Sequence, residues 1–186
     1  GKAKQYAIEN PKTTFAGIQA NIEERIFRDT IAHEYKIRSN YPRTPVSILT
    51  METVLGWPAN REQILAMIAS ILETSLKKDG VTGEKGLTGY TTIGPHAIAE
   101  LLAKFDRLDP SLFPDLFKKF PALRQTFRFH VDTWCFEKYY PKEGDGSAFA
   151  SQSPNYAGVS FVKPASGIEP SMYQFLWRLY ELTRDP

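Results

Sequence analysis

Apolar residues recur at helical spacing in the first part of the chain. The positions that share one face of this segment are Phe15, Ile18, Ile22, Ile26 and Ile31. This spacing predicts a helix of roughly six turns, since 3.6 residues make a turn, from Thr14 to Ile37. The segment "SNYPRTP" then interrupts the helix, because each proline disfavours helical geometry for the residue before it.

Two further helices follow with recognisable start signals. Thr44 and Pro45 form a good N-cap and first-turn pair, so "VSILTMETVLGW" predicts a helix that ends at Gly56. Asn60, with Gln63 three residues later, predicts a capping box for the next helix. Its apolar positions are Ile64, Leu65, Ile68, Ile71, Leu72 and Leu76. They leave little polar face, which predicts a central helix.

The second half of the chain shows the same kind of pattern. A fourth helix is marked by Ile98, Leu101, Leu102 and Phe105, and a longer one, after "FPDLFKKFP", by Leu123, Phe127, Val131 and Trp134. The segment "MYQFLWRLYEL" predicts a final helix, after a loop rich in Gly, Ser and Pro at about 141–167. No strand alternation or hairpin signal competes. We therefore predict an all-α domain of antiparallel helix pairs joined by long loops.

Composition narrows the possible partners. A length of 186 residues, with 42% hydrophobic and 24% charged residues, fits one medium globular domain. The net charge of +2 and the dispersed basic residues predict no nucleic-acid partner. The most apolar window, 64–72, is too short to span a membrane, so no membrane partner is expected. The single Cys135 cannot form an intrachain disulfide and is expected to pack as a small hydrophobe.

Four glycines crowd the stretch "DGVTGEKGLTGY" at 79–90, which ends in Tyr90. Glycine clusters mark turns, close backbone approach or a ligand contact. One interpretation is that these glycines only end one helix and begin another. The other is that they let a polymer approach the backbone beside Tyr90.

This stretch resembles the "D-G-x-x-x-E-G-S-P-G-Y" segment of the heparinase II/III-like polysaccharide lyases, with Lys85 inserted after Glu84. Three other segments are similar to family motifs in order and spacing. They are "RSNYP" at 38–42, "YYPKEGDGSAFAS" at 139–151, which is similar to "Y-P-D-G-x-x-G-D-x-G", and the final "LYELTRDP", which is similar to "L-y-x-L-T-G-D-P". The resemblance touches points across nearly the whole chain.

The resemblance implies an incomplete (α/α) toroid. Residues 1–186 would form a single helical domain, a fragment of a longer lyase-like protein without its C-terminal β-sandwich. That sandwich and an acidic polysaccharide would be the partners. The family also implies a periplasmic or secreted location, and no cofactor is expected.

Cleaving a uronate glycan by β-elimination needs a group that neutralises the carboxylate, a base for the α-proton and an acid for the departing oxygen O4. An Asn can donate to the carboxylate, and a Tyr can act as base or acid when positive charge lowers its pKa from about 10. By the resemblance, Asn40 and Tyr90 match these two roles. Many family members place a His after the Asn, whereas this chain has Tyr41, which either carries the proton or stacks on a sugar ring.

Three more residues are candidates for substrate binding. Arg38 can contact a carboxylate bidentately, Glu84 lies in the family motif, and His96 lies close to Tyr90 in sequence. For His33 and His130 we predict a hydrogen-bonded structural role, because an isolated His on an amphipathic helix commonly has one. No His, Cys or Asp cluster has metal-ligand spacing, so no metal is expected.

Two alternatives to the lyase remain. One is a non-catalytic helical domain that binds carbohydrate or a protein partner, and the other is a hydrolase that uses Glu84 with Asp79. The lyase requires Asn40, Tyr41 and Tyr90 to converge in one cleft. If these residues lie on separate faces, the non-catalytic domain is favoured.

Overall fold

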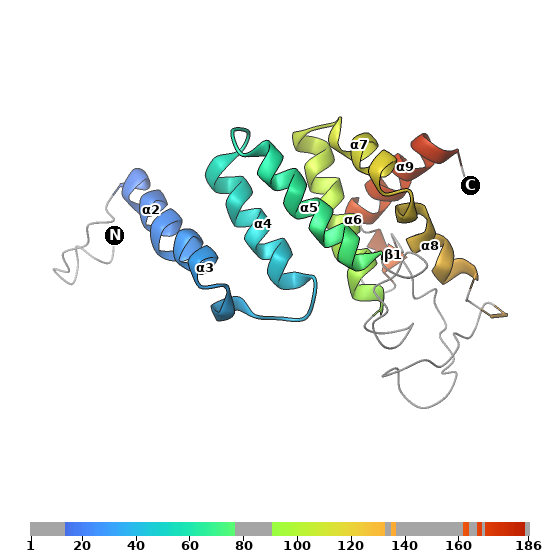
Figure 1. The fold of residues 1–186 in the computed structure, drawn as a ribbon, viewed down its shortest axis with the longest axis horizontal. Coiled ribbons are helices and arrows are strands. Elements are labelled where there is room, and N and C mark those ends of the chain that lie inside the picture. Colours follow the sequence, from blue (N-terminus) through green and yellow to red (C-terminus); the bar gives the residue numbers. More distant parts are fainter. Residues whose placement is uncertain are drawn as a thin grey trace, which may run out of the picture. The chain divides into compact units, whose positions relative to one another are not determined.

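The computed structural model describes residues 14–76, 91–132, 135–136, 162–163, 167–168 and 170–184. For 91–96, 129–131 and a few other residues it describes only the backbone. The described chain is almost entirely helical, which confirms the all-α prediction (Figure 1). It divides into two compact units, Gly1–Met67 and Ile68–Pro186, which we describe in turn. That 1–186 is one helical domain of a longer protein stays a prediction.

The first unit begins with helix α2, Phe15–Ile22. Thr14 caps it, because its Oγ1 accepts a hydrogen bond from the backbone N–H of Gly17 at 3.0 Å. The helical path continues through a π-helical stretch, η1 (Glu23–Arg28), into α3 (Asp29–Ala32). The predicted first helix is therefore confirmed up to Ala32.

The prediction is wrong for the last turn, because the α-helix ends at His33. The backbone of His33 leaves helical geometry with φ −134° and ψ 56°, and its N–H donates to the carbonyl of Thr30 at 3.2 Å. Its ring Nδ1 lies 2.9 Å from the carbonyl oxygen of Asp29, four residues back. In a continuing helix, the carbonyl of Asp29 would accept the backbone N–H of His33. Here the His33 ring occupies that carbonyl, which favours a helix end. A 3₁₀ turn, η2 (Glu34–Ile37), follows.

Helix α4, Arg43–Gly56, confirms the second predicted helix and its end. The predicted N-cap at Thr44 is wrong, because Pro42 occupies the cap position without a side-chain hydrogen bond. Thr44 instead bonds backward to the preceding loop. Its Oγ1 accepts from the N–H of Ser39 at 2.9 Å and donates to the carbonyl of Ile37 at 3.2 Å.

Helix α5, Arg61–Ser75, follows α4 after a short turn in which the chain reverses direction (Figure 1). The predicted capping box is wrong. Asn60 does occupy the N-cap position, since its carbonyl accepts from the N–H of Ile64 at 3.0 Å. Its side-chain Nδ2, however, donates to the carbonyl of Glu52 at 2.9 Å, and its Oδ1 accepts no hydrogen bond from the described residues. The predicted apolar positions that are buried in α5 are Ile64, Ile68, Ile71 and Leu72.

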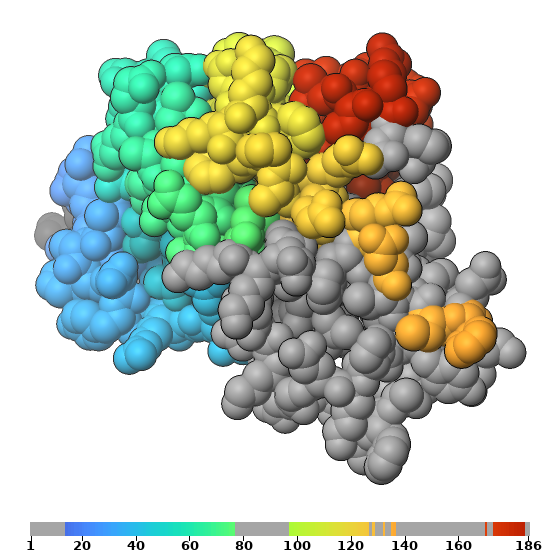
Figure 2. Space-filling model, turned by 45° about the vertical axis from the view of Figure 1, so that its right-hand side comes forward, coloured from blue at the N-terminus to red at the C-terminus, as the bar shows by residue number. Residues whose placement is uncertain are grey.

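In the second unit, α6 (Thr91–Leu108) contacts α9 (Pro170–Thr183) and α7 (Leu112–Lys119). The four residues that predicted α6 are all buried, namely Ile98, Leu101, Leu102 and Phe105. The rings of Phe113 and Phe175 meet edge to face, 5.3 Å apart between centroids. The outer faces of α7 (yellow) and α9 (red) are visible in the space-filling view (Figure 2).

Helix α7, which covers most of "FPDLFKKFP", was not predicted. Pro114 falls in the first turn, where a backbone N–H has no intrahelical partner to lose. Helix α8, Ala122–Asp132, confirms the helix after Pro121, whereas Trp134 lies outside the described residues.

The remaining described segments are short. Strand β1 (Val162–Lys163) pairs antiparallel with β2 (Gly167–Ile168) inside the predicted loop region. Cys135 is exposed, so the expectation that it packs as a small hydrophobe is wrong. These four strand residues are too few to change the helical fold class.

Candidate functional site

The loop between η2 and α4 carries three of the predicted site residues, Arg38, Asn40 and Tyr41. At Arg38 the backbone becomes extended, with φ −57° and ψ 124°, so the chain leaves the 3₁₀ turn there. The carbonyl of Asn40 accepts from the N–H of Arg43 at 2.9 Å, which closes the loop onto the first turn of α4. Together with the two bonds of Thr44, this contact sets the path of the loop.

A cavity of about 590 Å³ lies against this loop. Arg38 and Tyr41 both line it, as do His33 and Tyr35 from the preceding turn. Asn40 is exposed in the same loop but is not among the lining residues. Two of the predicted site residues thus share one cavity.

Arg38 provides positive charge at this cavity. Its side chain is exposed and forms no ion pair with the residues that the structure describes. An exposed guanidinium with five N–H donors suits a carboxylate, which it can hold with two parallel hydrogen bonds. The Tyr35 ring, 70% exposed in the same lining, offers a flat surface of the kind on which sugar rings stack.

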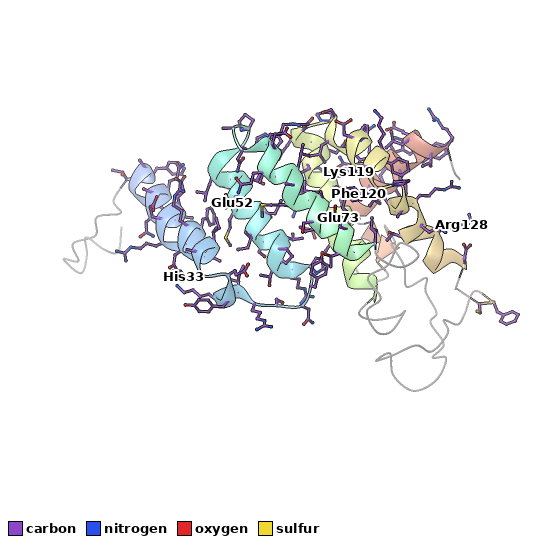
Figure 3. The ribbon with its side chains drawn as sticks, in the orientation of Figure 1. His33, Glu52, Glu73, Lys119, Phe120 and Arg128 are labelled. Atoms are coloured by element: carbon purple, nitrogen blue, oxygen red, sulfur yellow. The ribbon has the colours of Figure 1, made fainter. Side chains whose placement is uncertain are left out.

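His33 lies at the end of α3 (Figure 3). It bonds to Asp29, four residues earlier. Its Nδ1 is 3.1 Å from Asp29 Oδ1, and Lys36 Nζ donates to Asp29 Oδ2 at 2.7 Å. The hydrogen bond from Lys36 and its positive charge lower the pKa of Asp29, and the hydrogen bond to Asp29 raises the pKa of Lys36. The carboxylate of Asp29 is therefore held in its charged form.

The other predicted residues are not brought into this site by the structure. Tyr90 and Glu84 lie outside the described residues, and His96 belongs to α6, where only its backbone is described. The convergence of Asn40, Tyr41 and Tyr90 in one cleft stays a prediction.

Sequence reasoning missed two residues of this cavity, His33 and Tyr35. The predicted hydrogen bond of His33 is present, but the residue also lines the cavity with Arg38 and Tyr41. The spacing of Asp29 and His33, four residues apart, was the available signal. This spacing was insufficient to predict the cavity, because the predicted helix continued to Ile37 and so had no bend at His33.

Within the described ranges, no group of three or more His, Cys, Asp or Glu side chains could hold a metal ion. None of the helices described is both long and apolar enough to cross a membrane.

Comparisons of the chain with protein-family models, with curated proteins and with solved structures found no match.

Proposed function

We propose that this chain is the helical, substrate-cleft part of a polysaccharide lyase that cleaves uronate-containing acidic glycans by β-elimination. The observation that carries the proposal is the shared cavity of Arg38 and Tyr41, which combines a cation with a phenol. An incomplete (α/α) toroid, a C-terminal β-sandwich in the same parent chain, and a periplasmic or secreted location belong to this proposal.

The roles follow from the chemistry of the groups. The Arg38 guanidinium and the Asn40 amide bind the uronate carboxylate, and their hydrogen bonds stabilise the negative charge that develops when the α-proton leaves. Tyr90 and Tyr41 exchange protons with the sugar, one with the carbon beside the carboxylate and one with the departing O4. Glu84 and His96 bind neighbouring hydroxyl groups of the glycan.

The test is a screen of the full-length parent protein against alginate, heparin and chondroitin, followed at the absorbance of the new double bond, because the chain without the β-sandwich is expected to cleave slowly or not at all. We expect unsaturated product from at least one polymer. In Tyr90→Phe, which keeps the ring and loses the hydroxyl, turnover should fall by about a hundredfold or more. Arg38→Gln should weaken binding of the acidic glycan, whereas Arg28→Gln, an exposed arginine of the preceding helix, is the matched control. Unchanged turnover in Tyr90→Phe would remove Tyr90 from the mechanism.

A second candidate is a non-catalytic helical domain that binds carbohydrate. The exposed Tyr35 ring in the cavity lining favours it, because stacking on a sugar requires no reaction. This candidate predicts saturable binding of an oligosaccharide without product, and binding that Tyr35→Ala weakens and Tyr90→Phe leaves intact.

A further inference from the structure

The imidazole of His33 is fixed in one orientation by two oxygen atoms of Asp29. Nδ1 lies 2.9 Å from the carbonyl oxygen and 3.1 Å from the carboxylate oxygen Oδ1. A carbonyl oxygen and an ionised carboxylate accept hydrogen bonds and donate none. Nδ1 must therefore carry the proton, and in the neutral ring Nε2 keeps its lone pair.

Asp29 itself is held by a second contact, so that the arrangement is a chain of three side chains. Lys36 donates to Oδ2 at 2.7 Å, on the carboxylate oxygen that His33 does not use. The Asp29 carboxylate can then stabilise a positive charge on the ring when Nε2 takes a proton, as a buried or paired carboxylate does for other histidines. Lys36 keeps the carboxylate ionised for this purpose.

The remaining ring nitrogen, Nε2, belongs to a side chain that lines the cavity. Nε2 has no hydrogen-bond partner among the described residues, and the His33 side chain is 46% exposed. The ring of Tyr35 meets the imidazole edge to face at 5.9 Å, which restrains the ring from the other side. His33 lines the same cavity as Arg38 and Tyr41, the groups assigned to the carboxylate and to proton transfer.

We propose that His33 is the base that removes the α-proton of the uronate, with Asp29 as its positioning residue. This inference rests on the proposed lyase function and revises one step of it, since His33 replaces the tyrosine that would take the α-proton and leaves Tyr90 and Tyr41 to protonate O4. Nε2 takes the proton from C5, and the C5–H electron pair becomes the C4–C5 double bond. The C4–O4 bond breaks, and O4 takes a proton from a tyrosine hydroxyl, for which Tyr41 lies in the same cavity lining. The proton gained by His33 and the one lost by tyrosine are exchanged with water after product release.

The tautomer provides a test that needs no turnover. We expect ¹⁵N NMR of the histidine-labelled chain to show protonated Nδ1 and unprotonated Nε2 for the ring whose signal disappears in His33→Gln. A neutral ring with the proton on Nε2 would contradict the geometry and overturn the proposal.

The second test is catalytic and uses alginate oligosaccharides in deuterated water. Deuterium uptake at C5 and unsaturated product are both followed by mass spectrometry. His33→Gln should lower both rates by about a hundredfold or more, because the base is gone, while oligosaccharide affinity stays within about threefold. Asp29→Asn should lower kcat about tenfold and leave KM nearly unchanged, since a positioning residue acts after binding. Arg28→Gln, exposed on η1, controls for effects on folding, which circular dichroism monitors.

The outcomes separate the two proposals. If the wild type reacts and His33→Gln reacts equally fast, His33 is not the base and the lyase proposal stands. If the folded full-length protein gives neither exchange nor product with alginate, heparin and chondroitin oligosaccharides, the lyase proposal fails and the role of His33 fails with it.

Discussion

The hydroxyl of Thr44 ties together the segment that carries Arg38 and Tyr41. It receives the N–H of Ser39 and gives its proton to the carbonyl of Ile37, so one side chain satisfies a donor and an acceptor on either side of Arg38. Both bonds span five or more residues and leave no freedom for the loop to slide along α4. The position of the Arg38 guanidinium at the cavity thus depends on a residue that does not itself need to touch a ligand.

We expect Thr44→Val to lower the free energy of unfolding by about 1–3 kcal/mol, because two backbone groups lose their partner, one of them in a partly buried hydrogen bond. Thr44→Ser, which retains the hydroxyl, should lose less than about 1 kcal/mol. Urea denaturation of the three proteins gives both values. Equal losses in the two variants would show that the methyl group, and not the hydroxyl, holds the loop.

Three polar side chains, Asp106 of α6 and Gln174 and Arg178 of α9, connect these helices beside their apolar contact, and we call them the polar seam. Asp106 accepts hydrogen bonds from Arg178 Nε at 3.1 Å and from Gln174 Nε2 at 3.3 Å, and its side chain is only 11% exposed. Arg178 is shared with Glu181 of its own helix, at 2.6 Å from Nη1 to Oε2. A carboxylate that is nearly buried with its partners fixes how the two helices face each other, because any rotation would leave its charge unpaired.

The first prediction for these helices concerns Asp106. Asp106→Ala should destabilise the chain by about 2–4 kcal/mol, because Arg178 and Gln174 lose a partly buried acceptor. Glu100→Gln on the same helix breaks an exposed pair with Lys104 and should cost less than about 1 kcal/mol. Chemical denaturation of both variants measures the difference, and similar losses would show that the seam has no special stability.

The second prediction for these helices concerns how their stability depends on pH in the acidic range. The hydrogen bond from Arg178, and with it one from Trp177 and nearby positive charge, lowers the pKa of Glu181 below its usual 4.5. A carboxyl group with a lowered native pKa stabilises the fold fully above its unfolded pKa, and the contribution is lost as pH falls through the native pKa. Wild type should therefore exceed Glu181→Gln in urea midpoint near neutral pH, and the gap should close below pH 4.5. A gap that widens in acid would contradict the assignment.

The degree to which apolar side chains are buried differs between parts of the molecule. The second unit has a closely packed core in which the Phe113 and Phe175 side chains are 1% exposed. On α2, in contrast, Phe15 is 82% and Ile18 45% exposed, although both belong to the predicted apolar face. Apolar surface contributes to stability only when it leaves water, so that face adds little to folding.

Two isoleucines of the first unit, one buried and one exposed, test whether the apolar face of α2 contributes to stability. Ile64→Ala, at a fully buried position, should cost about 2–5 kcal/mol, because it removes buried surface and leaves a cavity. Ile18→Ala should cost less than about 1 kcal/mol. Thermal and urea unfolding distinguish the two, and an equally large loss at Ile18 would mean that the α2 face is covered in solution.

Local patterns were sufficient for most of the helices and for the buried residues of α5 and α6. Ile68 and Leu72 of α5, and Leu102 and Phe105 of α6, were predicted and are buried, because neighbours three and four apart share a helix face in any fold. The start of the first helix at Thr14 was also predicted, and Thr14 caps that helix through Gly17, three residues away. Where two contacting residues lie within one helical turn, both are found in the same short stretch of sequence.

Contacts between residues farther apart, and side chains with a choice of partner, needed the folded chain. Thr44 and Asn60 had the right residue type for capping, but Ile37 and Glu52 offered their side chains other partners. His33 ended the first helix through its own side chain and so came to the cavity of Arg38 and Tyr41. A hydrogen-bonding side chain selects among all acceptors within reach, and in a folded chain those acceptors are set by geometry, not by distance along the sequence.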